Sequence, residues 1–158
     1  MANEKNKDFN KMLHDSKDMP KIKIITDQKS IEKYGGDKMY FAPPVDYDEI
    51  MKQIPCGKLI TVGEIRKYFA KVNDADFTDP ITAGIFVSIA AWASEQREDD
   101  KTPYWRTLKA KGELNPKYPG RVEEQKKKLE EEGHKIIKKG RTNIRYYVEN
   151  YEEKLYDL

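Results

Sequence analysis

Hydrophobic positions along the chain recur at the spacing of short helices, and residues suited to helix capping stand where these helices begin. A first helix is predicted over Tyr47–Gln53, because Asp46 suits the capping position before it and Glu49 follows three residues later. Thr61 stands in the same relation to a second helix over Val62–Ala70. The pattern therefore predicts two capped helices in succession, joined by a turn that contains a proline and a glycine.

The most apolar segment of the chain follows an acidic turn. Asp79 suits the capping position of a helix over Pro80–Gln96, and proline is well tolerated at a first helical position. Apolar residues occupy nearly every side of this helix, so we expect it to lie at the centre of the core. Gly84 and Ser88 are small residues that would let another element or a ligand approach it closely.

The later part of the chain alternates short apolar runs with charged ones. Thr107–Leu114 is predicted to form two short strands around a glycine turn. A charged helix is expected over Val122–Glu132, with Gly133 ending it in the left-handed conformation. Two apolar runs then flank Lys138-Lys139-Gly140-Arg141, which predicts a β-hairpin with a basic tip. The fold class expected is α+β, a small helical domain with a helix-turn-helix, winged-helix-like core and this hairpin.

These elements divide the chain into four segments. The first has no sustained apolar period and is expected to be a disordered or frayed tail. The second is expected to be extended and to pack on the core, with a docking site for a partner as the alternative. The third is the folded domain and the fourth an acidic tail. In order, the segments are residues 1–20, 21–45, 46–148 and 149–158.

Composition narrows the class of protein further. The chain has 158 residues, of which 37% are hydrophobic and 37% charged, which fits one domain with a small core. The mostly apolar run Ala83–Ala93 is half the length that a bilayer requires. A single cysteine, Cys56, excludes a disulfide scaffold, and two distant histidines argue against a metal site. The first residues, Met1–Lys7, are polar. We therefore expect a cytoplasmic monomer without metal or cofactor.

Charge is distributed unevenly along the chain. Residues 101–148 hold 14 Lys and Arg against 6 Asp and Glu, a net charge of +8, whereas residues 1–100 hold 15 against 18, a net charge of −3. A basic segment of this size suits a surface that binds a polyanion, because neutralising phosphates releases counterions. A solvated charged face with no partner is the other interpretation.

The order of several short motifs resembles one known family. The segment 54–65, IPCGKLITVGEI, resembles the opening of the DNA-binding domain of methylated-DNA–protein cysteine methyltransferases. Further landmarks follow in the family's order over residues 46–136. They are the helix 80–91 at the place of the recognition helix, Pro103-Tyr104-Trp105-Arg106 at the place of the active-site motif Pro-Cys-His-Arg, Gly112-Glu113-Leu114, and the closing set Gln125, Leu129, Glu132 and Gly133.

The departures from this family determine the function that the resemblance implies. Tyr104 stands at the position of the acceptor cysteine and Trp105 at that of the activating histidine, so transfer of an alkyl group to this chain is not expected. The chain is thus most similar to the alkyltransferase-like proteins, which lack the acceptor cysteine and bind alkylated DNA in DNA repair. Their base-flipping tyrosine corresponds to Val62 here, and their inserted arginine falls near Gly84.

The resemblance and the basic segment together give a set of expected DNA contacts. These residues are Thr61, Val62, Gly84, Ser88, Tyr104, Arg106, Lys109, Lys111, Lys138, Lys139 and Arg141. Tyr104 and Trp105 would either stack on a base or fill the vacated active-site cavity. Arg106 would either contact phosphate or pair with Glu132 or Glu113.

Two other functions remain open at this stage. One is a protein-interaction module that has lost DNA binding, which the apolar helix 80–96 favours. The other is an enzyme with new chemistry built from Tyr104, Arg106 and Glu132.

Overall fold

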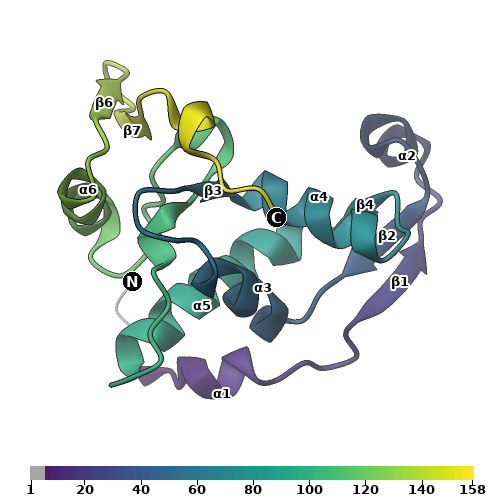
Figure 1. The fold of residues 1–158 in the computed structure, drawn as a ribbon. Coiled ribbons are helices and arrows are strands. Elements are labelled where there is room, and N and C mark those ends of the chain that lie inside the picture. Colours follow the sequence, from purple (N-terminus) through teal and green to yellow (C-terminus); the bar gives the residue numbers. More distant parts are fainter. Residues whose placement is uncertain (1–5) are drawn as a thin grey trace.

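The long helix α5, Pro80–Gln96, lies at the centre of the fold in the computed structural model, which describes residues 6–158 (Figure 1). The helix begins at the predicted residue. Asp79 caps it, since a carboxylate oxygen of Asp79 accepts a hydrogen bond of 2.9 Å from the backbone N–H of Thr82. Helices α1 (Phe9–Leu13), α3 (Pro44–Lys52) and α4 (Val62–Val72) pack against it. The expectation of a buried central helix is therefore confirmed.

Two other predicted helices form with small shifts at their ends. Thr61 caps α4 as predicted, since its hydroxyl accepts a hydrogen bond of 3.2 Å from the backbone N–H of Glu64. Helix α3 begins at Pro44, three residues earlier than predicted, so Asp46 lies in its first turn and does not cap it. Proline at the first position explains the early start, because its missing N–H would have no partner there.

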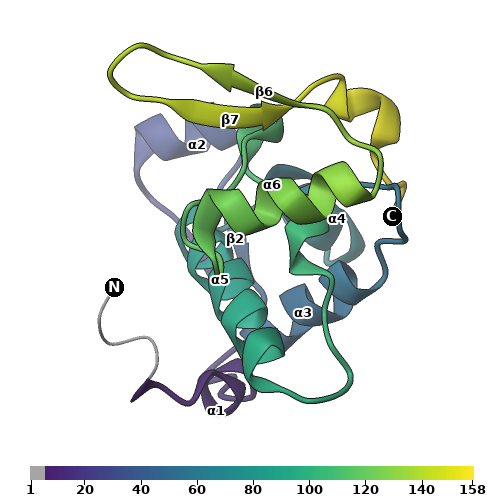
Figure 2. The ribbon, with the colours of Figure 1, turned by 90° about the vertical axis from the view of Figure 1, so that its left-hand side faces the viewer.

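The charged helix and the hairpin also form. Helix α6 spans Arg121–Glu131, and Gly133 follows it with a φ of 92°, the left-handed conformation predicted. Strand β6 (Ile136–Lys139) pairs antiparallel with β7 (Arg145–Val148), and Figure 2 shows this hairpin above α6. The mixed α+β class expected from the sequence is confirmed.

The segment 21–45, expected to be extended, contains a strand–helix–strand unit. Strands β1 (Lys21–Ile24) and β2 (Lys38–Phe41) pair antiparallel, and helix α2 (Gln28–Tyr34) connects them. Strand β4 (Phe77–Thr78) adds to β2 in parallel, so the sheet order is β1-β2-β4. This small sheet ties the segment to the chain just before α5.

The expected strand pair over 107–114 is wrong. Strand β5 (Thr107–Leu108) pairs in parallel with β3 (Ile60–Thr61), and a 3-10 turn, η3 (Ala110–Gly112), follows it. The segment therefore pairs with a strand far away in the sequence, and its own second half turns back through a hydrogen bond from the Lys109 N–H to the Glu113 carbonyl (2.9 Å).

The tail expected over residues 1–20 is folded from Phe9 onward; residues 1–5 lie outside the described part of the chain. Phe9 and Leu13 are 5% and 1% exposed, and Phe9 stacks on Trp92 with ring centroids 5.6 Å apart. These two residues lie four positions apart, so they share one face of the short helix, and this face packs on α5. Mostly polar residues surround Phe9 and Leu13 in the sequence, so the hydrophobic pattern does not predict this helix.

The acidic C-terminal segment also contacts the domain. A 3-10 helix, η4 (Tyr151–Lys154), precedes a stretch in which the Tyr156 N–H donates to the Leu59 carbonyl (2.7 Å) and the Leu59 N–H donates to the Lys154 carbonyl (2.9 Å). Tyr156 and Leu158 pack against the main core. Residues 149–158 are thus part of the fold and not a free tail.

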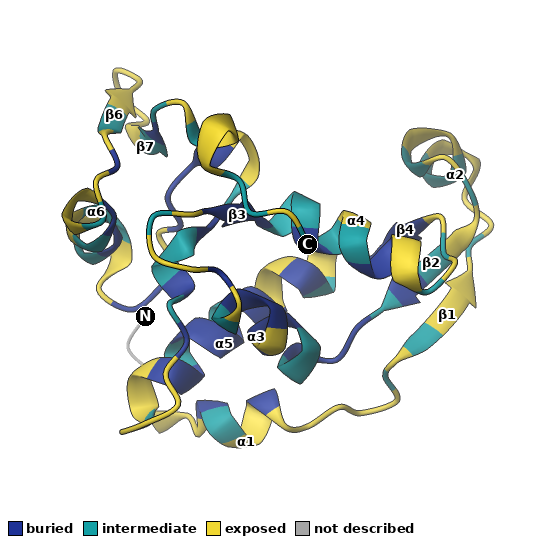
Figure 3. Cartoon of the chain, in the orientation of Figure 1, coloured by how far each residue is buried: buried dark blue, intermediate teal, exposed yellow. Residues whose placement is uncertain are grey.

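Buried residues form two neighbouring clusters (Figure 3). The larger surrounds α5 and includes residues of α1, α3 and α4. The smaller lies between α6 and the hairpin and is built on Leu59, Leu108, Leu114, Leu129 and Val148. No helix of residues 6–158 is both long and apolar enough to cross a membrane.

Candidate nucleic-acid interface

Tyr104 occupies the position where the resembled family has its reactive cysteine, and it is buried. The residue is 3% exposed and lies in the larger core cluster. Its ring meets those of Trp105 and Tyr118 edge to face, with centroids 5.4 and 5.3 Å apart. Burial raises the pKa of the Tyr104 hydroxyl, with Glu95 and Glu124 adding to the rise. Tyr104 is therefore a neutral packing residue, and the expectation that it contacts DNA is corrected.

Arg106 and Glu132 form a closely bonded ion pair beside this aromatic cluster. The Arg106 Nη2 lies 2.7 Å from Glu132 Oε2, and Nε donates to both carboxylate oxygens at 3.0 and 3.1 Å. Trp105 Nε1 donates to the same carboxylate at 3.0 Å. The side chains of Arg106 and Glu132 are 14% and 11% exposed. Of the two roles expected for Arg106, the structure shows the ion pair with Glu132. This corrects the expected contact of Arg106 with phosphate.

The ionisation of Glu132 reflects these bonds. Burial disfavours its charged form, but the hydrogen bonds from Arg106 and Trp105 outweigh the burial, so the pKa of Glu132 lies below its ordinary value. A carboxylate held in this way is ionised and fully engaged at neutral pH. The pair acts as a clamp between the Tyr104–Arg106 turn and the end of α6.

Cys56 lies in the turn before β3, and its side chain is exposed. The turn borders the clamp, because the Ile54 carbonyl accepts a hydrogen bond of 2.7 Å from Arg106 Nη1. No three His, Cys, Asp or Glu side chains of residues 6–158 gather as ligands of a metal ion.

A groove of about 250 Å³ runs between α4, α5 and the loop 109–117; we call it the α4–α5 groove. Its lining combines small, apolar and basic side chains. The lining residues are Val62, Gly63, Arg66, Pro80, Gly84, Val87, Lys109, Ala110, Asn115, Pro116 and Lys117. Among residues 6–158, three cations and no carboxylate line the groove, which gives it a positive electrostatic potential.

Several of the expected contact residues meet in this groove. Val62 belongs to the first turn of α4, where a helix leaves N–H groups without intrahelical partners and favours anions. Thr61 is 7% exposed and acts through its cap. Gly84 is exposed, and nothing lies within 4 Å of a Cβ added there, so α5 presents an open, flat position to the groove.

Ser88 has a different place from the one expected. Its hydroxyl lies 3.5 Å from the Lys117 carbonyl, the same oxygen to which Trp92 Nε1 donates at 2.8 Å. Ser88 and Trp92 therefore face the 115–118 loop and help to hold one wall of the groove. Ser88 is half-buried at this wall, and its expected contact with DNA stays a prediction.

The basic residues after the Tyr104–Arg106 turn are exposed in differing degrees. Lys109 is 42% exposed at its side chain, with its Nζ 3.8 Å from a Glu113 carboxylate oxygen. Lys111 is exposed on the η3 turn. Arg66 and Lys117 complete the cations of the groove; sequence reasoning left both out of the expected contacts. Lys117 belongs to the basic segment, which is the signal that could have identified it, whereas Arg66 lies in residues 1–100, whose net charge is negative.

Lys138, Lys139 and Arg141 lie on the hairpin as expected, all three exposed. The two lysines belong to strand β6 and only Arg141 to the tip. The hairpin is joined to the groove loop, because the Leu114 N–H donates to the Tyr146 carbonyl at 2.9 Å. Its cations are therefore carried on an arm fixed to one wall of the groove.

The first turns of α5 also carry exposed apolar side chains. Ile81 and Ile85 are 73% and 52% exposed, the largest exposures among the apolar residues of this helix. They stand beside Gly84 on the same side of the helix, since positions three or four apart share a face. The face is thus apolar at its centre and basic along the groove.

Comparison with known proteins gives the following similarities. No family model and no curated protein matches the chain. The crystal structure of S. pombe Atl1 in complex with damaged DNA containing O6-carboxymethylguanine is 21% identical, with a TM-score of 0.47. The structure of S. pombe ATL in complex with DNA is 22% identical, with a TM-score of 0.48.

Each of these two comparisons covers 73% of this chain and 94% of the other. They are alkyltransferase-like proteins, the class that the sequence landmarks resemble. Identity and TM-score are both low, so the roles given to side chains here rest on the contacts of this chain alone.

Proposed function

We propose that this chain binds duplex DNA in the α4–α5 groove and does not accept an alkyl group from it. The observation that carries the proposal is the composition of the groove, with Arg66, Lys109 and Lys117 on its walls and no carboxylate. The start of helix α4, at Val62, borders the same groove. Phosphates suit both features, because they are anions that accept hydrogen bonds from N–H groups.

The exposed cations of the hairpin support a DNA-binding surface that extends beyond the groove. Lys138, Lys139 and Arg141 stand on an arm attached to the groove loop, where they would follow a backbone leaving the groove. Alkylated DNA, as in DNA repair, is the substrate class that we favour. Binding would be by the cytoplasmic monomer expected from the sequence.

Three features support a function without alkyl transfer. Tyr104 fills the place of the acceptor cysteine, its pKa is raised by burial, and Glu132 is engaged by Arg106. Cys56 is exposed. After incubation with a duplex that carries an alkylated guanine, we expect mass spectrometry of the intact chain to show no added alkyl group. An adduct on Cys56 would refute this part of the proposal.

Fluorescence anisotropy tests DNA binding directly. A labelled plain duplex and a matched duplex with one alkylated guanine are titrated with the protein over a series of salt concentrations. We expect binding that weakens as salt increases, since phosphate contacts release counterions. The variant Lys109→Ser/Lys117→Ser should bind about tenfold or more weakly at moderate salt. Lys11→Ser, on the exposed surface of α1, is the matched control and should bind normally.

Two results would overturn the proposal. One is that neither duplex binds at low salt. The other is that the groove variant binds as tightly as the control variant, because the charge of the groove would then be irrelevant to binding.

A second candidate function is a protein-interaction module, which the exposure of Ile81 and Ile85 favours. Burying two such side chains against a partner would contribute about 1.5–3 kcal/mol each. This candidate predicts that DNA does not bind, and that the chain self-associates in sedimentation velocity in a manner abolished by Ile81→Ser/Ile85→Ser. A monomer that binds DNA argues against it.

A further inference from the structure

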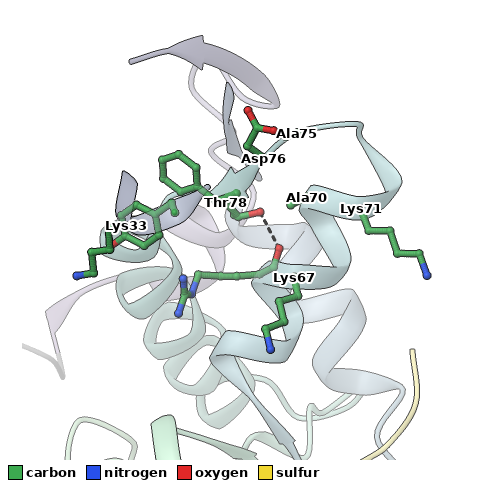
Figure 4. A pocket seen from close by; sticks show the side chains of 10 residues that line it. Lys33, Lys67, Ala70, Lys71, Ala75, Asp76 and Thr78 are labelled. Atoms are coloured by element: carbon green, nitrogen blue, oxygen red, sulfur yellow. Dashed lines mark hydrogen bonds between the residues drawn. The ribbon is translucent and has the colours of Figure 1, made fainter. Parts of the chain in front are cut away.

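A second basic cavity lies beside the α4–α5 groove, between helices α2 and α4 and above strand β4. It has a volume of about 430 Å³, and we call it the α2–α4 pocket (Figure 4). Its lining residues are Lys33, Tyr34, Arg66, Lys67, Ala70, Lys71, Ala75, Asp76, Phe77 and Thr78. Figure 4 shows Lys33 on one side of the pocket and Lys71 on the other, with Lys67 between them.

The charge of this pocket is strongly positive. Four of its lining residues are cations and one, Asp76, is a carboxylate. One oxygen of Asp76 already accepts a hydrogen bond of 3.0 Å from the Lys38 N–H. Within residues 6–158 no carboxylate oxygen lies within 4.0 Å of the charged groups of Lys33, Arg66 or Lys71, whereas Lys67 stands 3.5 Å from Glu64.

The pocket is held in shape by packed and hydrogen-bonded groups. The rings of Tyr34 and Phe77 stack with centroids 4.4 Å apart and an angle of 9° between their planes, which joins α2 to β4. The Thr78 hydroxyl donates to the Arg66 carbonyl at 2.8 Å, which joins β4 to α4. The backbone elements that carry the four cations are therefore fixed relative to one another, while Figure 4 shows the lysine side chains spread around the rim of the pocket.

Arg66 lines both the α2–α4 pocket and the α4–α5 groove. Lys67 and Lys71 follow it along α4, away from the groove. A phosphodiester strand that leaves the groove past Arg66 would thus meet Lys67, Lys71 and Lys33.

We propose that the α2–α4 pocket binds backbone phosphates of DNA that flank the segment held in the α4–α5 groove. This inference rests on the proposed function and extends it to the strand–helix–strand unit of residues 21–41. Phosphate contacts of this kind carry no sequence information, and they add affinity and fix the orientation of the duplex. The role of α2 is to place Lys33 opposite Lys71.

Substitution of the two outermost lysines tests this inference. Lys33→Ser/Lys71→Ser is compared with Lys29→Ser, which removes an exposed lysine of the same helix α2 that does not line the pocket. Binding to a long duplex is measured by fluorescence anisotropy over a salt series. Circular dichroism establishes that both variants fold.

The pocket variant should lose affinity by about tenfold per lysine at about 0.1 M salt, and the slope of log K against log salt should fall by about 2. The control variant should keep the affinity and slope of the unaltered chain. A shorter duplex that fills the groove alone should bind both variants equally, because the flanking phosphates are then missing.

The outcomes separate the two proposals. If the unaltered chain binds no duplex, the proposed function is overturned and this inference with it. If the chain binds DNA through Lys109 and Lys117 but the pocket variant retains the slope and affinity of its control, the inference alone is overturned. A loss confined to the pocket variant and to long duplexes supports it.

Discussion

Replacing Arg106 by methionine should destabilise the chain without changing its affinity for DNA. The substitution keeps most of the apolar stem but removes the guanidinium that donates to Glu132 and to the Ile54 carbonyl. The Glu132 carboxylate, 11% exposed, would then keep the Trp105 bond as its one described side-chain partner. An unpaired carboxylate in such a place is unfavourable because burial disfavours its charge.

The expected loss follows from the bonds that disappear. Breaking a buried ion pair by removing one partner costs about 3–5 kcal/mol, and the residual exposure of this pair places the value near the lower end, at about 3 kcal/mol. For a chain of this size, that loss corresponds to a fall in Tm of about 6–12 °C. Arg145→Met is the matched control, because Arg145 meets Glu113 at 3.5 Å with 53% of its side chain exposed. That variant should lose less than about 1 kcal/mol.

The loss should also depend on pH in a defined direction. The pKa of Glu132 in the folded chain lies below its ordinary value of 4.5, so its contribution to stability is present above that pH. The contribution disappears as the pH falls through the folded pKa, because both states are then protonated. The difference in stability between the unaltered chain and Arg106→Met should therefore be largest near neutral pH and shrink in acid.

Urea unfolding followed by tryptophan fluorescence measures these changes, and anisotropy at a temperature where the variants remain folded measures DNA binding. The double variant Arg106→Met/Glu132→Leu should recover part of the lost stability, since no unpaired charge remains. A loss below about 1 kcal/mol in Arg106→Met, or a double variant less stable than the single one, would refute the clamp. A tenfold loss of DNA affinity in the folded variant would show that Arg106 contacts DNA after all.

Further predictions concern two glycines and a histidine. Gly112→Ala should destabilise the chain by at least about 1 kcal/mol, because Gly112 has a φ of 81° and an added Cβ would lie 2.5 Å from a Tyr151 ring carbon. Gly84→Ala should instead raise Tm slightly, since the position is helical and open, and thermal unfolding that shows the reverse order would contradict both. Burial lowers the pKa of His134, with Arg106 and Lys154 adding to the effect against the opposing Glu132. Between the lowered pKa of His134 in the folded chain and its ordinary pKa of 6.5, the unfolded chain binds more protons than the folded chain. The stability should therefore fall as the pH drops through that region. His134→Leu should remove this part of the pH dependence in urea unfolding, and an unchanged profile would contradict the assignment.

Local signals in the sequence predicted the elements that local interactions decide. The caps at Thr61 and Asp79 and the left-handed Gly133 each act within one turn of their own helix, and all three were predicted correctly. The hairpin was predicted because its two apolar runs are close together in the sequence. The interpretation of Arg106 as a partner of Glu132 was one of two alternatives, and only the folded geometry selected it.

Elements that depend on distant contacts were missed for a common physical reason. Strand β4 has two residues and forms because β2 offers it free backbone groups, so nothing in residues 77–78 alone predicts a strand. Helix α1 depends on Trp92 and Gln96, which lie far along the chain. The α2–α4 pocket joins cations from two helices that the sequence keeps well apart, and no charge count over a continuous segment detects such a site.

Helix α5 is anchored at one end and open at the other. Its C-terminal half is held by α1, where Phe9 stacks on Trp92 and the Asn10 side chain donates to the Ala93 carbonyl. Its first two turns present Ile81 and Ile85 to solvent. Ala83 and Phe86 are buried beside them and belong to the core, so selection is free to vary only the exposed positions of these turns without disturbing the fold. Positions 81 and 85 are where a randomised library would explore new binding specificities at least risk to expression.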